Sequence, residues 1–445
     1  MHSRPAALAA LTVALCLPAQ AQPRPFVPVA QATPSMPRAD ARSGSTLTLD
    51  DAFARVQGQH PDLRLFGNRR SVLEAERDLA ARKPPLVAGA TLENFLGSGA
   101  DRGVQAAEAT LTLASVFERG GKLDARRTLA ERRIDALAVE RETRRLDLLG
   151  ETARRYLAMV AAREQRGIAE LDIAQRKRTV AAARQRLQAG ASPESVLLTA
   201  QAALARAELE RDRAGQRHIA ARQHLAALWG EREPGFDVAG GDPLELPRID
   251  DTKALATLLE RTPELRQFAD ERRVREARLQ LARSEARADL DWSVGVRRLQ
   301  ADGDFGLVAG MSLPLGARTR AQPAIRAAEA ELASLEIERE ATDLSLYSTL
   351  VEAHGRYRVA RAEVARLRDD VLPKLGKAEA AAERAYRAGA IGYLEWAQLQ
   401  SERTATRRQQ LDAALDAQRA LIELQRLTGQ PLVVDAAPSA RGNTP

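Results

Sequence analysis

The sequence predicts a mainly α-helical protein with a small β part, built from two copies of one structural unit. Of its 445 residues 44% are hydrophobic but only 4% are aromatic. Ala, Leu, Glu, Arg and Gln are abundant, and such a composition favours long helices over a large mixed core. Three landmarks recur roughly 200 residues apart, and strand-like alternation is confined to two short stretches.

The repeat is carried by segments that occur in the same order in both halves. A shared order at constant spacing indicates an internal duplication, with a first repeat over 46–240 and a second over 247–430. The matching segments are His60-Pro61-Asp62-Leu63-Arg64 with Thr262-Pro263-Glu264-Leu265-Arg266, Leu187-Gln188-Ala189-Gly190 with Tyr386-Arg387-Ala388-Gly389, and Leu225-Ala226-Ala227-Leu228-Trp229-Gly230 with Leu424-Gln425-Arg426-Leu427-Thr428-Gly429.

The two ends of the chain lie outside the repeats. Residues 1–21 combine a charged start, a short apolar run and a small-x-small site ending at Ala21, which predicts a secretory signal peptide. A leader rich in Pro, Ala and Ser over 22–45 and a flexible tail over 431–445 are expected. Cys16, the only cysteine, falls within the signal peptide, so no disulfide or Cys-based metal site is expected in the mature chain.

Each repeat is expected to contain a helix, a β-hairpin, a very long helix, a tip turn and a closing helix. The first helices are predicted at about 48–82 and about 251–286. The long helices, at about 120–188 and about 321–387, would each extend roughly 100 Å. Pro323 lies in an opening turn, where proline is tolerated, whereas Pro373 predicts a kink or break.

The hairpins are predicted at about 84–116 and about 288–315, with strands of roughly ten residues that suit a tilted crossing of a bilayer. No stretch approaches a membrane-spanning helix in length, so a closed β-barrel is the remaining way to span a membrane. Four strands cannot close a pore, and other copies must contribute. The side chains expected to face lipid are Leu290, Trp292, Val294, Val296, Phe305, Leu307 and Met311. Those expected to face the lumen are Asp291, Ser293, Arg297, Glu108 and Thr110.

The charged residues argue against several classes of protein. The net charge of +7 comes from 67 basic and 60 acidic residues that lie interspersed, which indicates solvated helix faces and no nucleic-acid site. The sequence has no HExxH motif, no Cys/His cluster and no Gly-rich phosphate loop. We therefore expect no enzymatic activity, no cofactor and no resident metal.

The order of elements, given twice, resembles the TolC family of outer-membrane efflux factors, over residues 46–430. Its motifs are Leu47-Thr48-Leu49-Asp50-Asp51-Ala52-Phe53, Glu118-Arg119-Gly120-Gly121-Lys122 and Leu313-Pro314-Leu315-Gly316, together with the two tip segments. The resemblance implies a homotrimer with a long α-helical barrel and a transmembrane β-barrel of four strands per protomer. It implies an outer membrane of a Gram-negative bacterium, with the helical portion in the periplasm. It also implies a passive exit duct that works with a periplasmic adaptor (membrane fusion protein) and an inner-membrane RND transporter.

Within the family, Glu93-Asn94-Phe95 and Gly120-Gly121-Lys122 look most like the CzcC branch. That resemblance implies export of heavy-metal cations such as cobalt, zinc, cadmium, copper or silver. Unlike many relatives, the expected mature chain carries no cysteine for an N-terminal lipid, and Ser115-Val116 lacks a proline that is common there.

The resemblance also assigns roles at the two tips. The turns would dock the adaptor, through Ala189, Gly190, Ala191 and Ser192 in one repeat and Ala388, Gly389, Ala390, Ile391 and Gly392 in the other. Glu395, with Gln398 one turn further on, would line the periplasmic gate, where three copies would form a ring that favours cations.

Other functions stay open at this point. Multidrug efflux or type I secretion would use the same duct. A soluble periplasmic coiled-coil adaptor or scaffold would explain the helices but not two hairpins in equivalent places. The sequence does not identify the cargo, the partner pump and adaptor, the resting state of the gate or whether the N-terminus is lipidated.

Overall fold

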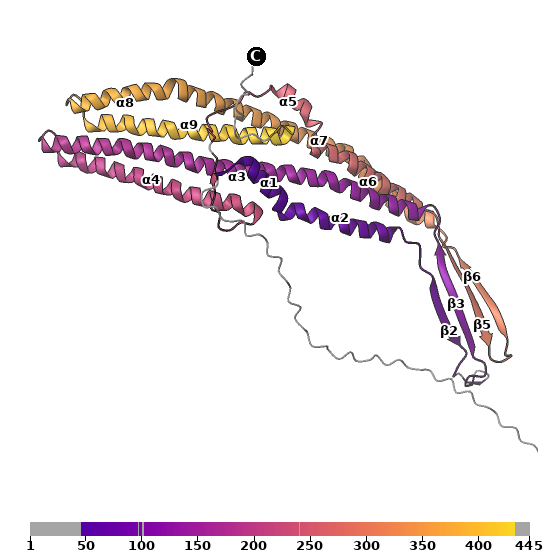
Figure 1. Ribbon diagram of the computed structural model, residues 1–445. Helices are drawn as coiled ribbons and strands as arrows, with labels where there is room; N and C mark the ends of the chain where they lie inside the picture. The colour runs from indigo at the N-terminus through magenta and orange to yellow at the C-terminus, as the bar shows by residue number, and fades with distance from the viewer. Residues whose placement is uncertain (1–45, 97, 100–101, 240, 432–445) are drawn as a thin grey trace, which may run out of the picture. The chain divides into compact units, whose positions relative to one another are not determined.

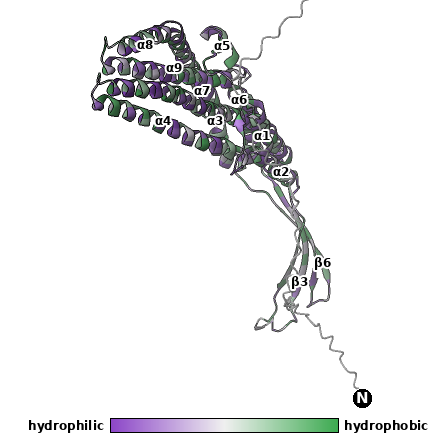
Figure 2. Ribbon diagram, turned by 60° about the vertical axis from the view of Figure 1, so that its left-hand side comes forward, coloured by the Kyte–Doolittle hydropathy of each residue, from purple (hydrophilic) through white to green (hydrophobic). Residues whose placement is uncertain are grey.

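The computed structural model describes residues 46–96, 98–99, 102–239 and 241–431. The expected signal peptide, the leader to residue 45 and the tail from residue 432 lie outside the described residues. The described part is a set of helices that lie side by side and lead into a four-stranded sheet (Figure 1). None of its helices contains an apolar stretch long enough to cross a membrane. Hydrophilic and hydrophobic residues instead alternate along the helices (Figure 2).

The elements follow one another in the same order in the two repeats. The first repeat contains β1 (Thr46–Leu47), α1 (Leu49–Gln59), α2 (Pro61–Ala80), β2 (Val87–Glu93), β3 (Glu108–Phe117), α3 (Lys122–Gln188), α4 (Glu194–Ala226), the 3₁₀ turn η2 (Ala227–Trp229) and β4 (Asp237–Val238). The second contains α5 (Thr252–Leu259), α6 (Pro263–Glu285), β5 (Leu290–Leu299), β6 (Phe305–Ser312), α7 (Ala317–Arg366), the π-helical turn η3 (Leu367–Val371), α8 (Leu372–Arg387) and α9 (Tyr393–Thr428).

The first helix of each repeat is broken in two, which corrects the expectation of single helices at about 48–82 and about 251–286. The breaks fall at His60 and Thr262, each followed by a proline at the first position of the next helix. Proline disfavours the helical conformation in the residue before it, so the chain must restart. His60 Nδ1 accepts the Asp62 N–H at 3.2 Å, and Thr262 Oγ1 accepts the Leu265 N–H at 3.4 Å. Both side chains therefore cap the new helix.

The long helix of the second repeat is interrupted by η3 just before Pro373. A proline has no N–H for the carbonyl four residues earlier and crowds that carbonyl. The wider π turn accommodates this defect without ending the helical path. In the first repeat α3 continues for 67 residues without such a break.

The four-stranded sheet joins the two repeats. Its order is β2-β3-β5-β6 and every neighbouring pair is antiparallel. The helices nearest the sheet pack in the matching order α2-α3-α6-α7. A second, two-stranded parallel sheet pairs β1 with β4, which the sequence did not predict because each strand has only two residues.

The helices pack closely because small residues line their contacts. On α4 the residues buried against α3 include Ala200, Ala207 and Ala214, at seven-residue spacing. Near the far end of α9, Arg426 contacts Glu264 of its own repeat at 2.9 Å and Asp147 of the first repeat at 3.1 Å. Burial lowers the pKa of Arg426, but these two carboxylates and that of Glu423 together raise it above its ordinary value.

Candidate functional site

One face of the four-stranded sheet is apolar, apart from Arg298, which pairs with Phe305 at the end remote from the helices. Side chains alternate along a strand, and cross-strand partners share a face. The register Trp292–Met311, Val294–Ala309 and Val296–Leu307 therefore sets these residues on one side of the sheet. That side, named here the apolar face, carries all seven residues expected to face lipid: Leu290, Trp292, Val294, Val296, Phe305, Leu307 and Met311. Leu290 and Trp292 are half-buried, and the other five are exposed in the single chain, to 90% for Leu307 and 75% for Met311.

The opposite side, named here the polar face, carries the five residues expected to face the lumen. Three of them are in contact: Arg297 Nη1 lies 2.9 Å from Glu108 Oε2, and Arg297 Nε donates to Thr110 Oγ1 at 3.1 Å. Glu93 joins them, with its Oε2 3.5 Å from Arg297 Nη2. The other two, Asp291 and Ser293, lie on the same face nearer the helices. Sequence reasoning missed Glu93 as a member of this group, although the alternation along its strand could have included it.

Three glycines on the polar face, Gly89, Gly295 and Gly310, mark places with little room for a side chain. A Cβ on Gly295 would lie 2.5 Å from the carbonyl oxygen of Leu111. A Cβ on Gly89 or Gly310 would lie 2.8 Å from the hydroxyl of Thr112 or Ser293. Crowding on one side is expected on the concave face of a coiled sheet, where glycine admits close backbone approach.

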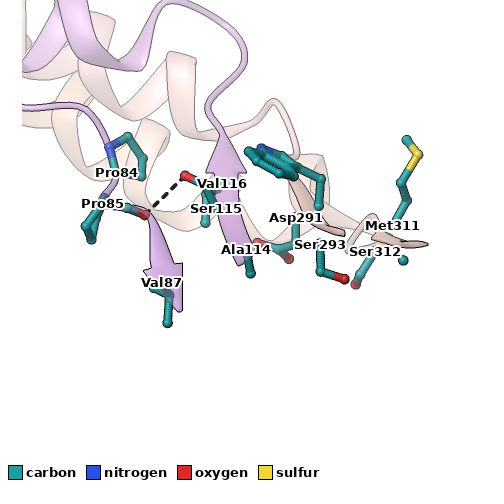
Figure 3. Close-up of a pocket in the computed structure, with 12 residues that line it drawn as sticks. Pro84, Pro85, Val87, Ala114, Ser115, Val116, Asp291, Ser293, Met311 and Ser312 are labelled. Atoms are coloured by element: carbon teal, nitrogen blue, oxygen red, sulfur yellow. Dashed lines mark hydrogen bonds between the residues drawn. The ribbon is translucent and has the colours of Figure 1, made fainter. Parts of the chain in front are cut away.

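The helix-proximal end of the sheet borders an open hollow of about 570 Å³. Its lining comes from all four strands and from Pro84 and Pro85, which precede β2 (Figure 3). Ser115 Oγ donates to the carbonyl oxygen of Pro85 at 3.1 Å and fixes the entry of the chain into the sheet. The hollow is therefore part of the same sheet that carries the apolar and polar faces.

The tip turns at the far ends of α3 and α8 have the same backbone construction. Gly190 and Gly389 adopt φ +66° and +81°, the left-handed conformation that ends a helix. In each tip the residue after the glycine donates to the carbonyl five residues back, Ala191 to Arg186 at 2.8 Å and Ala390 to Ala385 at 2.9 Å. The residues expected to dock an adaptor are exposed, except for half-buried Ser192 and Ile391.

Arg186 connects the two tips, a contact that sequence reasoning missed. Its guanidinium stacks 4.8 Å from the ring centroid of Tyr386 and donates to the carbonyl oxygens of Tyr386 and Ala191. Beneath it Tyr386, Tyr393 and Trp396 form a buried aromatic cluster. No local pattern could reveal this pair, because 200 residues separate Arg186 from Tyr386.

Glu395 and Gln398, expected to line the gate, lie on one side of the first turns of α9. Both are exposed, and Leu394 beside them is also exposed. Trp396 points the other way, into the aromatic cluster. The tip thus presents a carboxylate to solvent from a helix that is anchored by buried rings.

Three of the four described histidines, His60, His218 and His354, have side chains in contact with neighbouring groups. His60 caps α2, and burial lowers its pKa. Buried His354 contacts Thr252 Oγ1 at 3.0 Å and the carbonyl oxygen of Asp250 at 3.2 Å. His218 Nε2 lies 3.4 Å from Asp237. Across the described ranges, no three potential metal ligands come together.

Comparison with known proteins gives the same assignment twice along the chain. The family described as "Outer membrane efflux protein" matches residues 58–231 and 254–430. The cobalt-zinc-cadmium resistance protein CzcC of Cupriavidus metallidurans is 30% identical over 281 residues, which cover 63% of this chain and 67% of that protein. The nickel-cobalt-cadmium resistance protein NccC of Alcaligenes xylosoxydans xylosoxydans is 25% identical over 265 residues, 58% of this chain and 60% of that one.

The fold is shared with a solved channel. The crystal structure of CusC superposes with a TM-score of 0.72 at 16% identity, over 85% of this chain and 91% of that one. The two family matches coincide with the internal repeat. The chain therefore belongs to the outer membrane efflux protein (TolC) family, in its CzcC-like branch, and is an outer-membrane efflux channel whose helical portion lies in the periplasm.

Proposed function

We propose that three copies of this chain close into one channel that serves as the passive, non-enzymatic exit duct of a tripartite pump for heavy-metal cations. A periplasmic adaptor and an inner-membrane RND transporter complete the pump and supply its energy. The observation that carries the proposal is the contrast between the two faces of the sheet. An apolar face exposed over four strands suits lipid, and a polar face behind it suits a water-filled lumen.

The edges of the chain support closure with other copies. Within the described residues β2 and β6 each leave one strand edge unpaired. The outer helices carry exposed apolar stripes at seven-residue spacing, Leu65, Val72 and Leu79 on α2 and Ile337, Leu344 and Val351 on α7. Seven-residue spacing is the pattern of a helix that packs against another helix. Because the two edges differ, each copy can pair β6 and α7 with β2 and α2 of the next, and such head-to-tail contacts close a ring.

Three copies supply twelve strands. A barrel of about eight strands is filled by its own side chains, whereas a larger one leaves room for water. Unpaired strand edges are not tolerated in lipid, so closure is required for insertion. The number three itself comes from the family resemblance.

Cation cargo is supported by the charge of the polar face and by the relatives. The polar face carries Glu93, Glu108 and Asp291 against one base, Arg297, so three negative charges less one positive leave two negative charges per copy. CzcC and NccC are named for resistance to cobalt, zinc and cadmium or to nickel, cobalt and cadmium. A conduit needs weak, repeated contacts with the ion, since tight binding would slow its exit.

The tips are the proposed entrance. Exposed Ala189, Gly190, Ala388 and Gly389 offer backbone groups without bulky side chains, which suits close contact with an adaptor helix hairpin. Glu395, repeated in three copies, would draw cations to the mouth, with Gln398 as a neutral second ring.

The test is cellular accumulation of zinc, cobalt, cadmium and copper in a strain that lacks the gene, complemented with wild-type or variant protein and compared with a panel of dyes. Wild type should lower metal accumulation and leave dyes unchanged. Glu395→Gln should retain part of this activity. Glu194→Gln is the matched control, because Glu194 is an exposed carboxylate in the first turn of α4 at the other tip. A change in dyes alone would refute the cargo, and equal loss in both variants would refute the gate role of Glu395.

A further inference from the structure

The four junctions between helices and strands lie together where α2, α3, α6 and α7 meet the sheet (Figure 1). With the adjoining helical turns they comprise residues 77–86, 117–125, 282–289 and 313–320. Each junction contains at least one exposed base that, among the described residues, has no carboxylate within ion-pair distance. These six residues, named here the basic collar, are Arg82, Lys83, Arg119, Arg287, Arg318 and Arg320.

The collar is unusual because most charges around it are paired. Only two exposed acids of the same segments, Asp124 and Glu285, lack an ion pair within the described chain. Six unpaired bases less these two acids leave four positive charges per copy. The ion pairs of the junctions are Arg77–Asp78, Lys122–Asp289, Arg126–Glu118 and Arg283–Glu329.

Exposed apolar side chains border the collar on its sheet side. Leu86, Phe117, Leu313 and Leu315 are exposed, and they continue the alternation of the apolar face toward the helices. The surface therefore changes from apolar to basic over a few residues in three of the four chain segments. At a membrane surface apolar side chains contact acyl chains, while Lys and Arg reach the headgroups.

We infer that the basic collar binds the phosphate groups of anionic phospholipids in the leaflet that faces the periplasm. The inference rests on the proposed function, in which the apolar face lies in lipid. The helices are periplasmic, so the helix-proximal rim of the sheet is at the periplasmic leaflet. Guanidinium and ammonium groups form charge-assisted hydrogen bonds with phosphate, and arginine can do so with two parallel bonds.

Trp292 provides a built-in reporter for the lipid beside the collar. It lies on the apolar face near the helix-proximal end of β5. The other two tryptophans, Trp229 and Trp396, are buried among the helices, with 8% and 1% exposure. Quenching of tryptophan fluorescence by brominated lipid in reconstituted vesicles therefore reports lipid contact at Trp292.

The experiment compares brominated phosphatidylglycerol with brominated phosphatidylcholine at equal mole fraction in vesicles containing the full chain. A base near a membrane surface contributes about five-fold in binding of anionic lipid, so wild type should prefer phosphatidylglycerol by at least about five-fold at low salt. High salt should weaken the preference because the contact is electrostatic.

Two variants with the same loss of charge separate the collar from general charge. The collar variant should lower the ratio of phosphatidylglycerol to phosphatidylcholine binding toward one. The control variant, altered at exposed bases near the tips, should keep the wild-type ratio. The collar variant is Arg82→Gln, Lys83→Gln, Arg318→Gln and Arg320→Gln. The control variant is Lys177→Gln, Arg178→Gln, Arg184→Gln and Lys377→Gln.

Equal quenching of wild type by both lipids, or equal loss of preference in the two variants, would overturn the collar inference. Absence of quenching by either lipid would instead show that the apolar face is not in the membrane, which would refute the proposed function.

Discussion

Arginine at Leu307 and arginine at Val308 should have opposite consequences, although the two residues are neighbours. Leu307 lies on the apolar face near the middle of β6, and Val308 lies on the polar face opposite Gly295. In the proposed channel Leu307→Arg puts a charge into lipid near mid-membrane, which costs about 2–4 kcal/mol. That cost lowers the ratio of folded to unfolded protein by about 30- to 1,000-fold. Val308→Arg puts the same charge at the same depth on the polar face, in the water of the proposed lumen.

The assay is folding of the purified chain into phospholipid vesicles across a urea series, followed by the fraction that resists dissociation in detergent without heating. Leu307→Arg should shift the midpoint to lower urea, while Val308→Arg should stay near wild type. If Val308→Arg is the more damaging, the assignment of lipid and lumen sides is inverted. If both behave like wild type, the sheet does not lie in a bilayer.

Three further changes test the fold. Burial lowers the pKa of His60 below its ordinary 6.5, so its stabilising contribution is present above pH 6.5 and is lost as the pH falls through 6.5, where the unfolded chain takes up the proton first. His60→Asn keeps a capping acceptor and should therefore make the melting temperature less dependent on pH between 7.5 and 5.5. An unchanged slope of melting temperature against pH would contradict this role of His60. Arg426→Met should lower the free energy of unfolding in urea by about 3–5 kcal/mol, because it leaves the Glu264 carboxylate unpaired and both side chains are under one fifth exposed. Adding Glu264→Gln should restore part of that loss. A double variant no more stable than the single variant would exclude this cause. Gly295→Ala should lower stability by about 1–3 kcal/mol, because the added Cβ overlaps the next strand. Gly306→Ala, on the same face but with open space around it, should leave stability nearly unchanged. Equal effects of the two variants would argue against crowding at Gly295.

Much of the fold could be predicted from the sequence because its signals extend over long windows. Helical spacing without proline persists over the length of α3, and strict alternation marks β5 and β6. The same alternation predicted two groups of strand residues, and the strand register places these groups on opposite faces of the sheet. Which set meets lipid is a matter for the Leu307 and Val308 experiment.

The missed features depend on one residue or on distant contacts. The helix breaks at His60 and Thr262 could have been predicted, since each precedes a proline with a usable cap. The contact of Arg186 with Tyr386 could not, because it exists only after the two repeats have packed. The same holds for Glu93 beside Arg297, which requires the strands to be in register.

The unlike edges of each chain have a genetic consequence. Every copy in the proposed ring contributes one β2 edge and one β6 edge, so a copy with a damaged edge spoils a ring that also contains intact copies. If a cell made intact and damaged chains in equal amounts and they mixed at random, only about one ring in eight would be wholly intact. A substitution that disables one edge but leaves the other able to join should therefore be dominant over the normal gene.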